Sequence, residues 1–167
     1  MDLYIKQKVF SFADKFSILD EAGNERYFVK GEVFSVGKRL RLYDMAGNEL
    51  ALIKQKVISL LPKYYILRDD QQIAEVTKEF TFLRNEYTVN AGSTAWKVHG
   101  DFLDHEYEVS DLGRCMVSVS KEWFSWGDTY KISILPGVDE ILALSVVLVI
   151  DACLDSDNGG GIRFTFN

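Results

Sequence analysis

Two lysine pairs in this chain have a spacing suited to holding a negatively charged group. Lys6 and Lys8 stand two residues apart in the phrase IKQKV, and Lys54 and Lys56 stand two apart in an identical second copy. Residues two apart in a β-strand project from the same face, so each pair is expected to present two ammonium groups on one side of its strand. The pairs are therefore candidates for an anion-binding patch.

The remaining basic candidates are Lys38, Arg39 and Arg41, which would extend such a patch. A lysine near an anionic bilayer contributes about 1 kcal/mol of attraction, which makes anionic lipid headgroups the ligand to consider. Lysines on strands are also ordinary solvated residues that keep sheet edges from pairing with other chains. Residue types and spacing favour this second interpretation, so the binding patch is a hypothesis.

Four neighbouring residues, His99, Asp104, His105 and Glu106, have side chains suited to metal binding or acid–base chemistry. A zinc site would need further carboxylate or cysteine ligands, and the chain has neither a paired CxxC nor an HExxH spacing. Asp and His are common turn residues, so FLDHEY at 102–107 is expected to form the tip of a short hairpin. No metal ion and no cofactor is predicted.

The stretch DSDNGGG at 155–161 has the start of a calcium-binding loop, but the pattern fails. Counted from Asp155, Gly159 takes position 5 and Phe166 takes position 12, where an EF-hand needs a bidentate glutamate. A flexible loop that ends a helix is expected instead. The chain also contains no GxSxG elbow and no Gly-rich phosphate loop. The sequence therefore does not predict an enzyme.

The composition is that of a folded protein with an acidic surface. The chain has 167 residues, a net charge of −6 and 2 cysteines, Cys115 and Cys153, which are expected to be free, buried thiols. The negative net charge argues against bulk electrostatic attraction to nucleic acid or to anionic lipid, although it is compatible with a local basic patch. The first residues, MDLYIKQKV, lack the apolar run of a signal peptide, so a cytoplasmic location is expected.

An internal repeat, with a spacing of 24 residues among its first three copies, indicates how these groups are positioned. The six units lie at 10–18, 34–42, 58–66, 80–89, 102–109 and 124–132. In each unit, bulky residues stand two apart on either side of a short linker, which is the pattern of a β-hairpin. Turn signals such as AlaGlyAsn at 22–24 and 46–48 separate the units. Six hairpins predict about twelve antiparallel strands.

Twelve twisted strands in an open sheet would leave two unpaired edges, so a closed antiparallel β-barrel is expected. A barrel of that many strands needs something to fill it. The segment Asp139–Leu154 can do so, because residues 141–150 are apolar except for Ser145 and predict a helix buried on every side. We therefore expect one domain, 1–167, with a central helix and a short last strand at 162–166.

The competing interpretation of this segment is a transmembrane helix. Crossing a bilayer takes about 20 mostly apolar residues. Here carboxylates at 139, 140, 151 and 155 bracket the apolar run on both sides. No transmembrane span is therefore predicted.

Several phrases resemble bacterial members of the LURP-one-related family, also called tubby-like. They are IKQKV (5–9 and 53–57), DMAGNELALIKQK (44–56), FLDHEY (102–107), SKEWF (120–124) and DTY (128–130), and the resemblance extends over 3–155. The family is related in fold to the tubby C-terminal domain and to phospholipid scramblases. The resemblance implies a barrel of twelve strands around one hydrophobic helix, as the repeat also predicts.

For function the resemblance implies less. Tubby domains bind phosphoinositide headgroups through basic residues and scramblases are membrane-associated, whereas the bacterial members have no established biochemical activity. The leading hypothesis is a non-catalytic cytoplasmic binding or regulatory module that binds anionic lipid headgroups at a membrane surface. The alternatives are a small-molecule carrier or enzyme with its site at the barrel mouth, and a protein-interaction scaffold.

Overall fold

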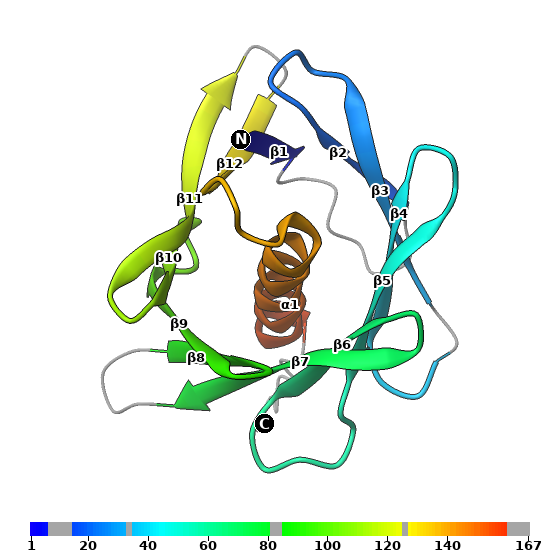
Figure 1. Ribbon diagram of the computed structural model, residues 1–167, viewed down its shortest axis with the longest axis vertical. Coiled ribbons are helices and arrows are strands. Elements are labelled where there is room, and N and C mark those ends of the chain that lie inside the picture. Colours follow the sequence, from blue (N-terminus) through cyan, green and yellow to red (C-terminus); the bar gives the residue numbers. More distant parts are fainter. Residues whose placement is uncertain (7–14, 33–34, 81–84, 125–126, 160–167) are drawn as a thin grey trace, which may run out of the picture.

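Twelve antiparallel strands form a closed barrel around a helix in the computed structural model (Figure 1). The structure describes residues 1–6, 15–32, 35–80, 85–124 and 127–159. The strands are β1 (Asp2–Lys6), β2 (Phe16–Leu19), β3 (Glu25–Gly31), β4 (Arg39–Asp44), β5 (Glu49–Gln55), β6 (Lys63–Arg68), β7 (Gln71–Phe80), β8 (Asn85–Ala91), β9 (Thr94–Asp101), β10 (Glu106–Asp111), β11 (Arg114–Phe124) and β12 (Gly127–Ile134), and the helix is α1 (Glu140–Gly159). The predicted barrel with a central helix is confirmed.

Each strand pairs with its neighbours in sequence, and β1 closes the ring against β12. In that closing pair Leu3 lies opposite Ile132, and Ile5 lies opposite Tyr130. Each unit of the repeat contains the connection of one hairpin, from β1–β2 to β11–β12. The predicted turn signals join one hairpin to the next. The repeat therefore gave the right strand number because each copy encodes one hairpin.

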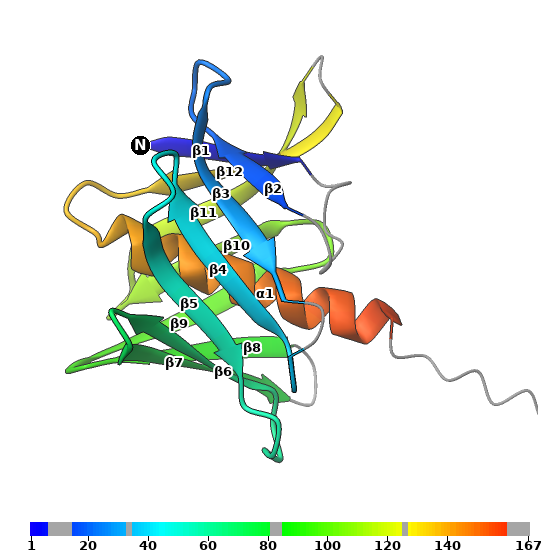
Figure 2. The same ribbon diagram turned by 90° about the vertical axis from the view of Figure 1, so that its right-hand side faces the viewer.

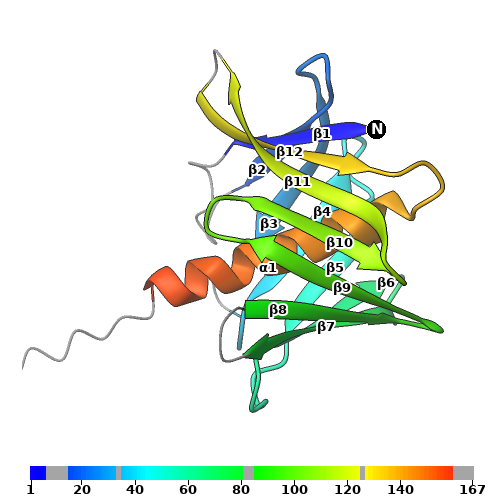
Figure 3. The same ribbon diagram turned by 90° about the vertical axis from the view of Figure 1, so that its left-hand side faces the viewer.

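Side chains along the strands alternate between the core and the outside, which is the geometry of a pleated strand. In β7, for example, Ala74, Val76 and Lys78 are buried while the residues between them are partly exposed. The inward residues pack around α1, whose residues 143–150 are all 0% exposed. A helix that is apolar on every side is stable in this position because the wall surrounds it, as Figures 2 and 3 show.

Asp139 caps the start of α1, where an acidic side chain is favourable because this end of the helix dipole is positive. Its Oδ1 atom accepts a hydrogen bond of 3.1 Å from the backbone N–H of Leu142. The same carboxylate accepts hydrogen bonds of 2.9 Å from Arg68 at the end of β6. The helix ends at Gly159 rather than at Leu154, and the strand predicted at 162–166 lies outside the described residues.

The two ends of the barrel differ in their connections. Where α1 begins, the strands are joined by short turns such as Asp69–Asp70 and Leu112–Gly113. Where α1 ends, β5 and β6 are joined by a longer connection at 56–62. The prediction that 58–60 belongs to a strand was wrong: the β5–β6 pairing finishes with the hydrogen bond from Lys56 N to Lys63 O, and the carbonyl of Pro62 accepts from Lys78 N on β7 instead.

Candidate functional site

Apolar side chains project into solvent at the end of the barrel where α1 ends. Val36 lies in the β3–β4 connection, and Val57, Ile58 and Leu60 lie in the β5–β6 connection. Ile58 is 87% exposed and Leu60 is fully exposed. Of the nine large apolar residues that are exposed in the described ranges, six lie on connections or strand ends at this end: Val36, Val57, Ile58, Leu60, Phe80 and Leu103. Apolar residues gathered in this way indicate a binding surface.

The β3–β4 and β5–β6 connections are held directly against each other. Lys38 and Gln55 exchange hydrogen bonds, with Gln55 N donating to Lys38 O and Lys38 N donating to the Gln55 side chain, both at 2.9 Å. Gly37 has a φ of 80°, and a Cβ atom there would lie 2.7 Å from Cγ2 of Val57. Glycine is therefore required at this contact, because any side chain would both strain the backbone and separate the two loops.

Two of the predicted lysines flank the exposed apolar residues. Lys54 lies near the end of β5 and Lys56 follows it, and both side chains are exposed. Within the part of the chain that the structure describes, neither lysine forms an ion pair. We define the apolar–lysine rim as the exposed apolar residues of these two adjoining connections together with the two lysines at the end of β5: Val36, Lys54, Lys56, Val57, Ile58 and Leu60.

The other predicted basic residues do not belong to the rim. Arg39 on β4 lies directly opposite Lys54, but its guanidinium is 3.6 Å from Glu32. Arg41 is bound by two carboxylates, which raise its pKa above the ordinary value. Lys6 lies at the end of β1, which β2, β3 and β4 separate from β5, so the two IKQKV copies are not adjacent. Lys8 lies outside the described residues.

Lys38, the last of the predicted residues, turns toward the helix instead of toward solvent. Its Nζ atom donates to the backbone carbonyl of Ala152 at 3.0 Å and to the carboxylate of Asp155 at 2.8 Å. A second lysine, Lys78, comes from the inner face of β7, and its ammonium group lies 2.5 Å from the carboxylate of Asp157. The C-terminal end of α1 is thus bound by two lysines of the barrel wall.

His105 belongs to a buried polar cluster next to the same end of the helix. FLDHEY forms the predicted turn between β9 and β10, and His105 occupies it with a φ of 55°. Its ring stacks on Tyr130 at a centroid distance of 4.5 Å, and its Nε2 atom is 3.5 Å from Oδ1 of Asp151. Tyr130 donates a short hydrogen bond to the other carboxylate oxygen. Burial, with the nearby carboxylate, raises the pKa of Tyr130 well above its ordinary value.

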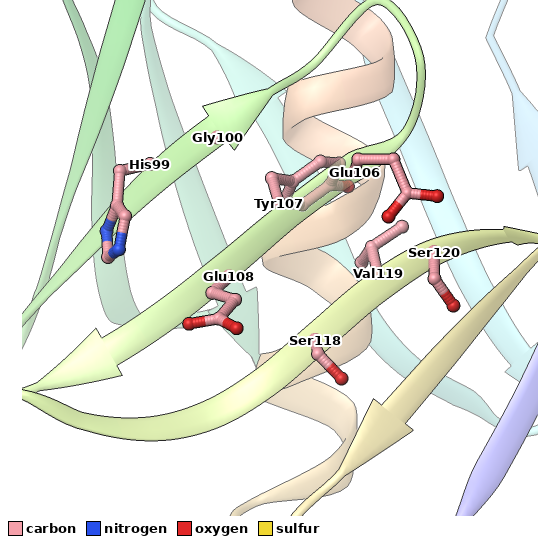
Figure 4. Close-up of a pocket in the computed structure, with 8 residues that line it drawn as sticks. All are labelled: His99, Gly100, Glu106, Tyr107, Glu108, Ser118, Val119 and Ser120. Atoms are coloured by element: carbon pink, nitrogen blue, oxygen red, sulfur yellow. The ribbon is translucent and has the colours of Figure 1, made fainter.

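A polar groove of about 420 Å³ lies on the outer wall over β9, β10 and β11 (Figure 4). His99, Glu108 and Ser118 occupy facing positions on these three strands, and their side chains project outward. Gly100 has a φ of 143°, and a Cβ atom there would lie 2.4 Å from the carbonyl oxygen of Glu106. The groove therefore depends on a glycine that lets β9 approach β10 closely.

The structure bears on two properties discussed for the sequence, metal binding and membrane spanning. The described ranges contain no cluster of three or more His, Cys, Asp or Glu residues that could hold a metal ion. In the same ranges, no helix combines the length and the apolar character needed to cross a bilayer. Both cysteines are free, and Cys153 is buried as predicted, but Cys115 is exposed because it lies at the start of β11.

Sequence reasoning missed the rim and the role of Lys78. Ile58 and Leu60 were assigned to a strand on their two-residue spacing, although Pro62 signals that the strand pattern is interrupted there. Lys78 continues the spacing of Ala74 and Val76 along β7, so the same two-residue period already places it on the inner face. A charged residue at an inward position is a signal for a buried ion pair.

Comparison with known proteins supports the resemblance found in the sequence. The family model for LURP-one-related proteins matches residues 1–151. The chain is 36% identical over 162 residues to the uncharacterized protein YxjI of Bacillus subtilis (strain 168), a match that covers 97% of this chain and 99% of that protein. The X-ray structure of a protein from Arabidopsis thaliana shares the fold, with a TM-score of 0.69 at 18% identity over 92% of this chain and 90% of that one. The chain therefore belongs to the LURP-one-related family.

Proposed function

We propose that this protein is a non-catalytic binding module that docks on anionic membrane surfaces through the apolar–lysine rim. The observation that carries the proposal is the exposure of Ile58 and Leu60 beside Lys54 and Lys56. Apolar side chains can enter the boundary between headgroups and acyl chains while neighbouring ammonium groups contact lipid phosphates and carboxylates. The barrel itself would remain outside the bilayer.

The rim has the two kinds of interaction that reversible membrane binding needs. Burying a large aliphatic side chain such as Ile58 or Leu60 is worth about 1.5–3 kcal/mol. Each lysine near an anionic surface adds about 1 kcal/mol. Two of each give about 5–8 kcal/mol, so binding is expected to be weak, reversible and dependent on both anionic lipid and ionic strength.

The arrangement of the acid–base residues supports a non-catalytic role. His105 and Asp151 have the residue types of a catalytic pair, but their side chains are only 12% and 3% exposed. A general base must reach the proton that it removes from a substrate. The cluster is instead suited to holding the β9–β10 turn against the helix.

Vesicle co-sedimentation tests the proposal. We expect the wild-type protein to pellet at low salt with vesicles that contain phosphatidylserine, and to remain in solution with vesicles of phosphatidylcholine alone. Ile58→Ser/Leu60→Ser and Lys54→Gln/Lys56→Gln should each reduce the bound fraction at least about tenfold, since each removes more than 1.4 kcal/mol. Lys6→Glu measures whether the patch extends to β1.

Matched controls separate the rim from general surface properties. Lys97→Gln/Arg114→Gln removes the same charge from exposed positions on β9 and β11, and Leu112→Ser removes a fully exposed leucine at the opposite end of the barrel. These variants should bind like the wild type. Absence of any vesicle association by the wild-type protein at low salt would rule out the membrane function.

The outer groove favours a second candidate, a carrier of small polar molecules. Its lining of His99, Glu106 and Glu108 with two serines offers hydrogen-bonding groups of the kind that select a ligand. A thermal-shift screen tests this function, because a ligand present at 100 times its dissociation constant stabilises the folded state by about 2.7 kcal/mol. A Glu108→Gln variant should lose the shift produced by any ligand that binds in the groove.

A further inference from the structure

The last turns of α1 carry negative charge where a helix dipole is itself negative. Asp155 and Asp157 lie in these turns, and α1 has no basic residue in its last turn. Acidic side chains at this end of a helix are unfavourable by about 0.3–1 kcal/mol each. The carboxylates are therefore not explained by the stability of the helix alone.

Both carboxylates are held by lysines that the barrel wall supplies. Lys38 is 23% exposed and Lys78 only 2% exposed, whereas their partners Asp155 and Asp157 are 40% and 50% exposed. The carboxylates therefore lie on the solvent side of the ammonium groups. An external anion that approached either lysine would meet the carboxylate first.

These two lysines lie beside the apolar–lysine rim, and Lys78 is joined to the connection that carries Ile58 and Leu60 because its backbone N–H donates to the carbonyl of Pro62. Lys38 is in the same connection as Val36, and its backbone is hydrogen-bonded to Gln55, which stands between Lys54 and Lys56. A bilayer that bound the rim would therefore place lipid headgroups next to the end of α1. The headgroups are negatively charged, as are the carboxylates that already form ion pairs with the two lysines.

We propose that the C-terminal turns of α1 act as a tethered anion that occludes Lys38 and Lys78, and that an anionic bilayer surface displaces them to reach these two lysines. The proposal rests on the proposed membrane function and specifies how it is regulated. In the free protein the two lysines are neutralised within the chain, so they add nothing to the attraction between the rim and anionic surfaces. On the membrane, lipid phosphates or carboxylates replace Asp155 and Asp157 and bind two further ammonium groups.

Removing the tethered charges tests the occlusion. Asp155→Asn/Asp157→Asn should bind vesicles containing phosphatidylserine at least about fivefold more tightly than the wild type, which is the factor for one additional lysine. Asp69→Asn/Asp70→Asn is the matched control, since it changes net charge equally at the other end of the barrel, and asparagine tolerates the positive φ values of 48° and 59° found there. The control should change binding less than twofold.

Cys153 reports displacement without altering either ion pair. Its thiol is buried at the end of α1, and this burial raises its pKa to about 11, so it should react slowly with a maleimide. In a Cys115→Ser background, vesicles containing phosphatidylserine should accelerate its modification several-fold. Phosphatidylcholine vesicles, and inorganic phosphate at matched ionic strength, should leave the rate unchanged.

The outcomes separate this inference from the membrane function. If the wild type binds anionic vesicles but Asp155→Asn/Asp157→Asn gains no more than the control, the carboxylates do not occlude the site. If binding occurs without faster Cys153 modification, the helix end is not displaced, and this result applies even where the double variant fails to fold. Faster modification with inorganic phosphate alone would show that any phosphate, not a bilayer, opens the site. Absence of binding by every variant refutes the membrane function itself.

Discussion

At the scale of single residues, a buried carboxylate is costly unless its oxygen atoms have partners. Asp151 is 4% exposed, and the hydroxyl of Tyr130 donates to its Oδ2 atom. The second oxygen, Oδ1, has no hydrogen-bond partner among the described residues and lies 3.5 Å from Nε2 of His105. Removing one member of such a group leaves the others buried without partners, which costs more than the original hydrogen bond contributed. The stability of the barrel should therefore depend on a single phenolic hydroxyl.

Tyr130→Phe is expected to lower the free energy of unfolding by about 1–3 kcal/mol, because it leaves a buried carboxylate oxygen unpaired. Tyr107→Phe is the matched control, since Tyr107 is equally buried but its hydroxyl has no hydrogen-bond partner among the described residues. That variant should be neutral or stabilising. Urea denaturation measures the free energy of unfolding of both variants. An equal decrease in the two variants would show that the hydrogen bond from Tyr130 to Asp151 does not stabilise the barrel.

Partners of this kind could not be predicted from the sequence. Asp151 and Asp155 both look unfavourable near the C-terminal end of a helix, and nothing nearby in the chain offers them a cation or a donor. Tyr130 comes from β12, and Lys38 comes from the β3–β4 connection. Such pairs form only when the barrel closes and brings distant segments to one end of α1.

At the scale of elements, the cap of α1 links the helix to the barrel wall. Partial burial of Asp139 works against ionisation, but hydrogen bonds from Arg68 and Leu142 outweigh it and lower the pKa below the ordinary value. A carboxyl group with a lowered folded-state pKa stabilises the protein above its unfolded pKa of about 3.9. That stabilisation is lost as pH falls through the lower, folded-state value.

Wild-type stability should therefore decrease more steeply below about pH 4 than that of Asp139→Asn, whose amide cannot titrate. At pH 7 the variant should lose only about 1 kcal/mol or less, because asparagine is also a good cap and the Arg68 pair is partly exposed. Thermal unfolding between pH 3 and pH 7 measures the difference. Parallel pH profiles for the two proteins would show that Asp139 does not contribute.

The elements also show where a periodic pattern is ambiguous. The spacing of Ile58 and Leu60 is equally compatible with a strand and with a loop that exposes both side chains, because a two-residue period records spacing and not burial. In β7, Ala74 and Val76 have the same spacing and are buried in the core. Burial depends on where hydrogen bonding stops, and for the β5–β6 pair it stops at the bond between Lys56 and Lys63.

At the scale of the whole molecule, α1 and the strands share one core. The helix residues from Ala143 to Ile150 are fully enclosed, and the inward residues of the wall pack around them. The fold was predictable from the sequence because repeat number, strand closure and the apolar run all require the same architecture. The rim was not predictable from the sequence, because it depends on the lengths of the connections at the end of the barrel where α1 ends.

Leu144→Asp should abolish folding, because an unpaired charge inside the barrel costs several kcal/mol against a total stability of about 5–15 kcal/mol. Leu112→Asp introduces the same charge at a fully exposed turn and should leave the melting temperature almost unchanged. Circular dichroism melts compare the two. Normal thermal stability of Leu144→Asp would show that the helix is not enclosed in solution.

The short turns where α1 begins have a practical consequence for handling the protein. Asp69–Asp70 and Leu112–Gly113 lie at the tips of hairpins on the end opposite the rim, and their side chains are exposed. Exposed turn tips are the positions that best tolerate inserted sequence. An affinity peptide or fluorescent label placed in either turn would attach the barrel to a sensor surface in one defined orientation, with the apolar–lysine rim directed outward.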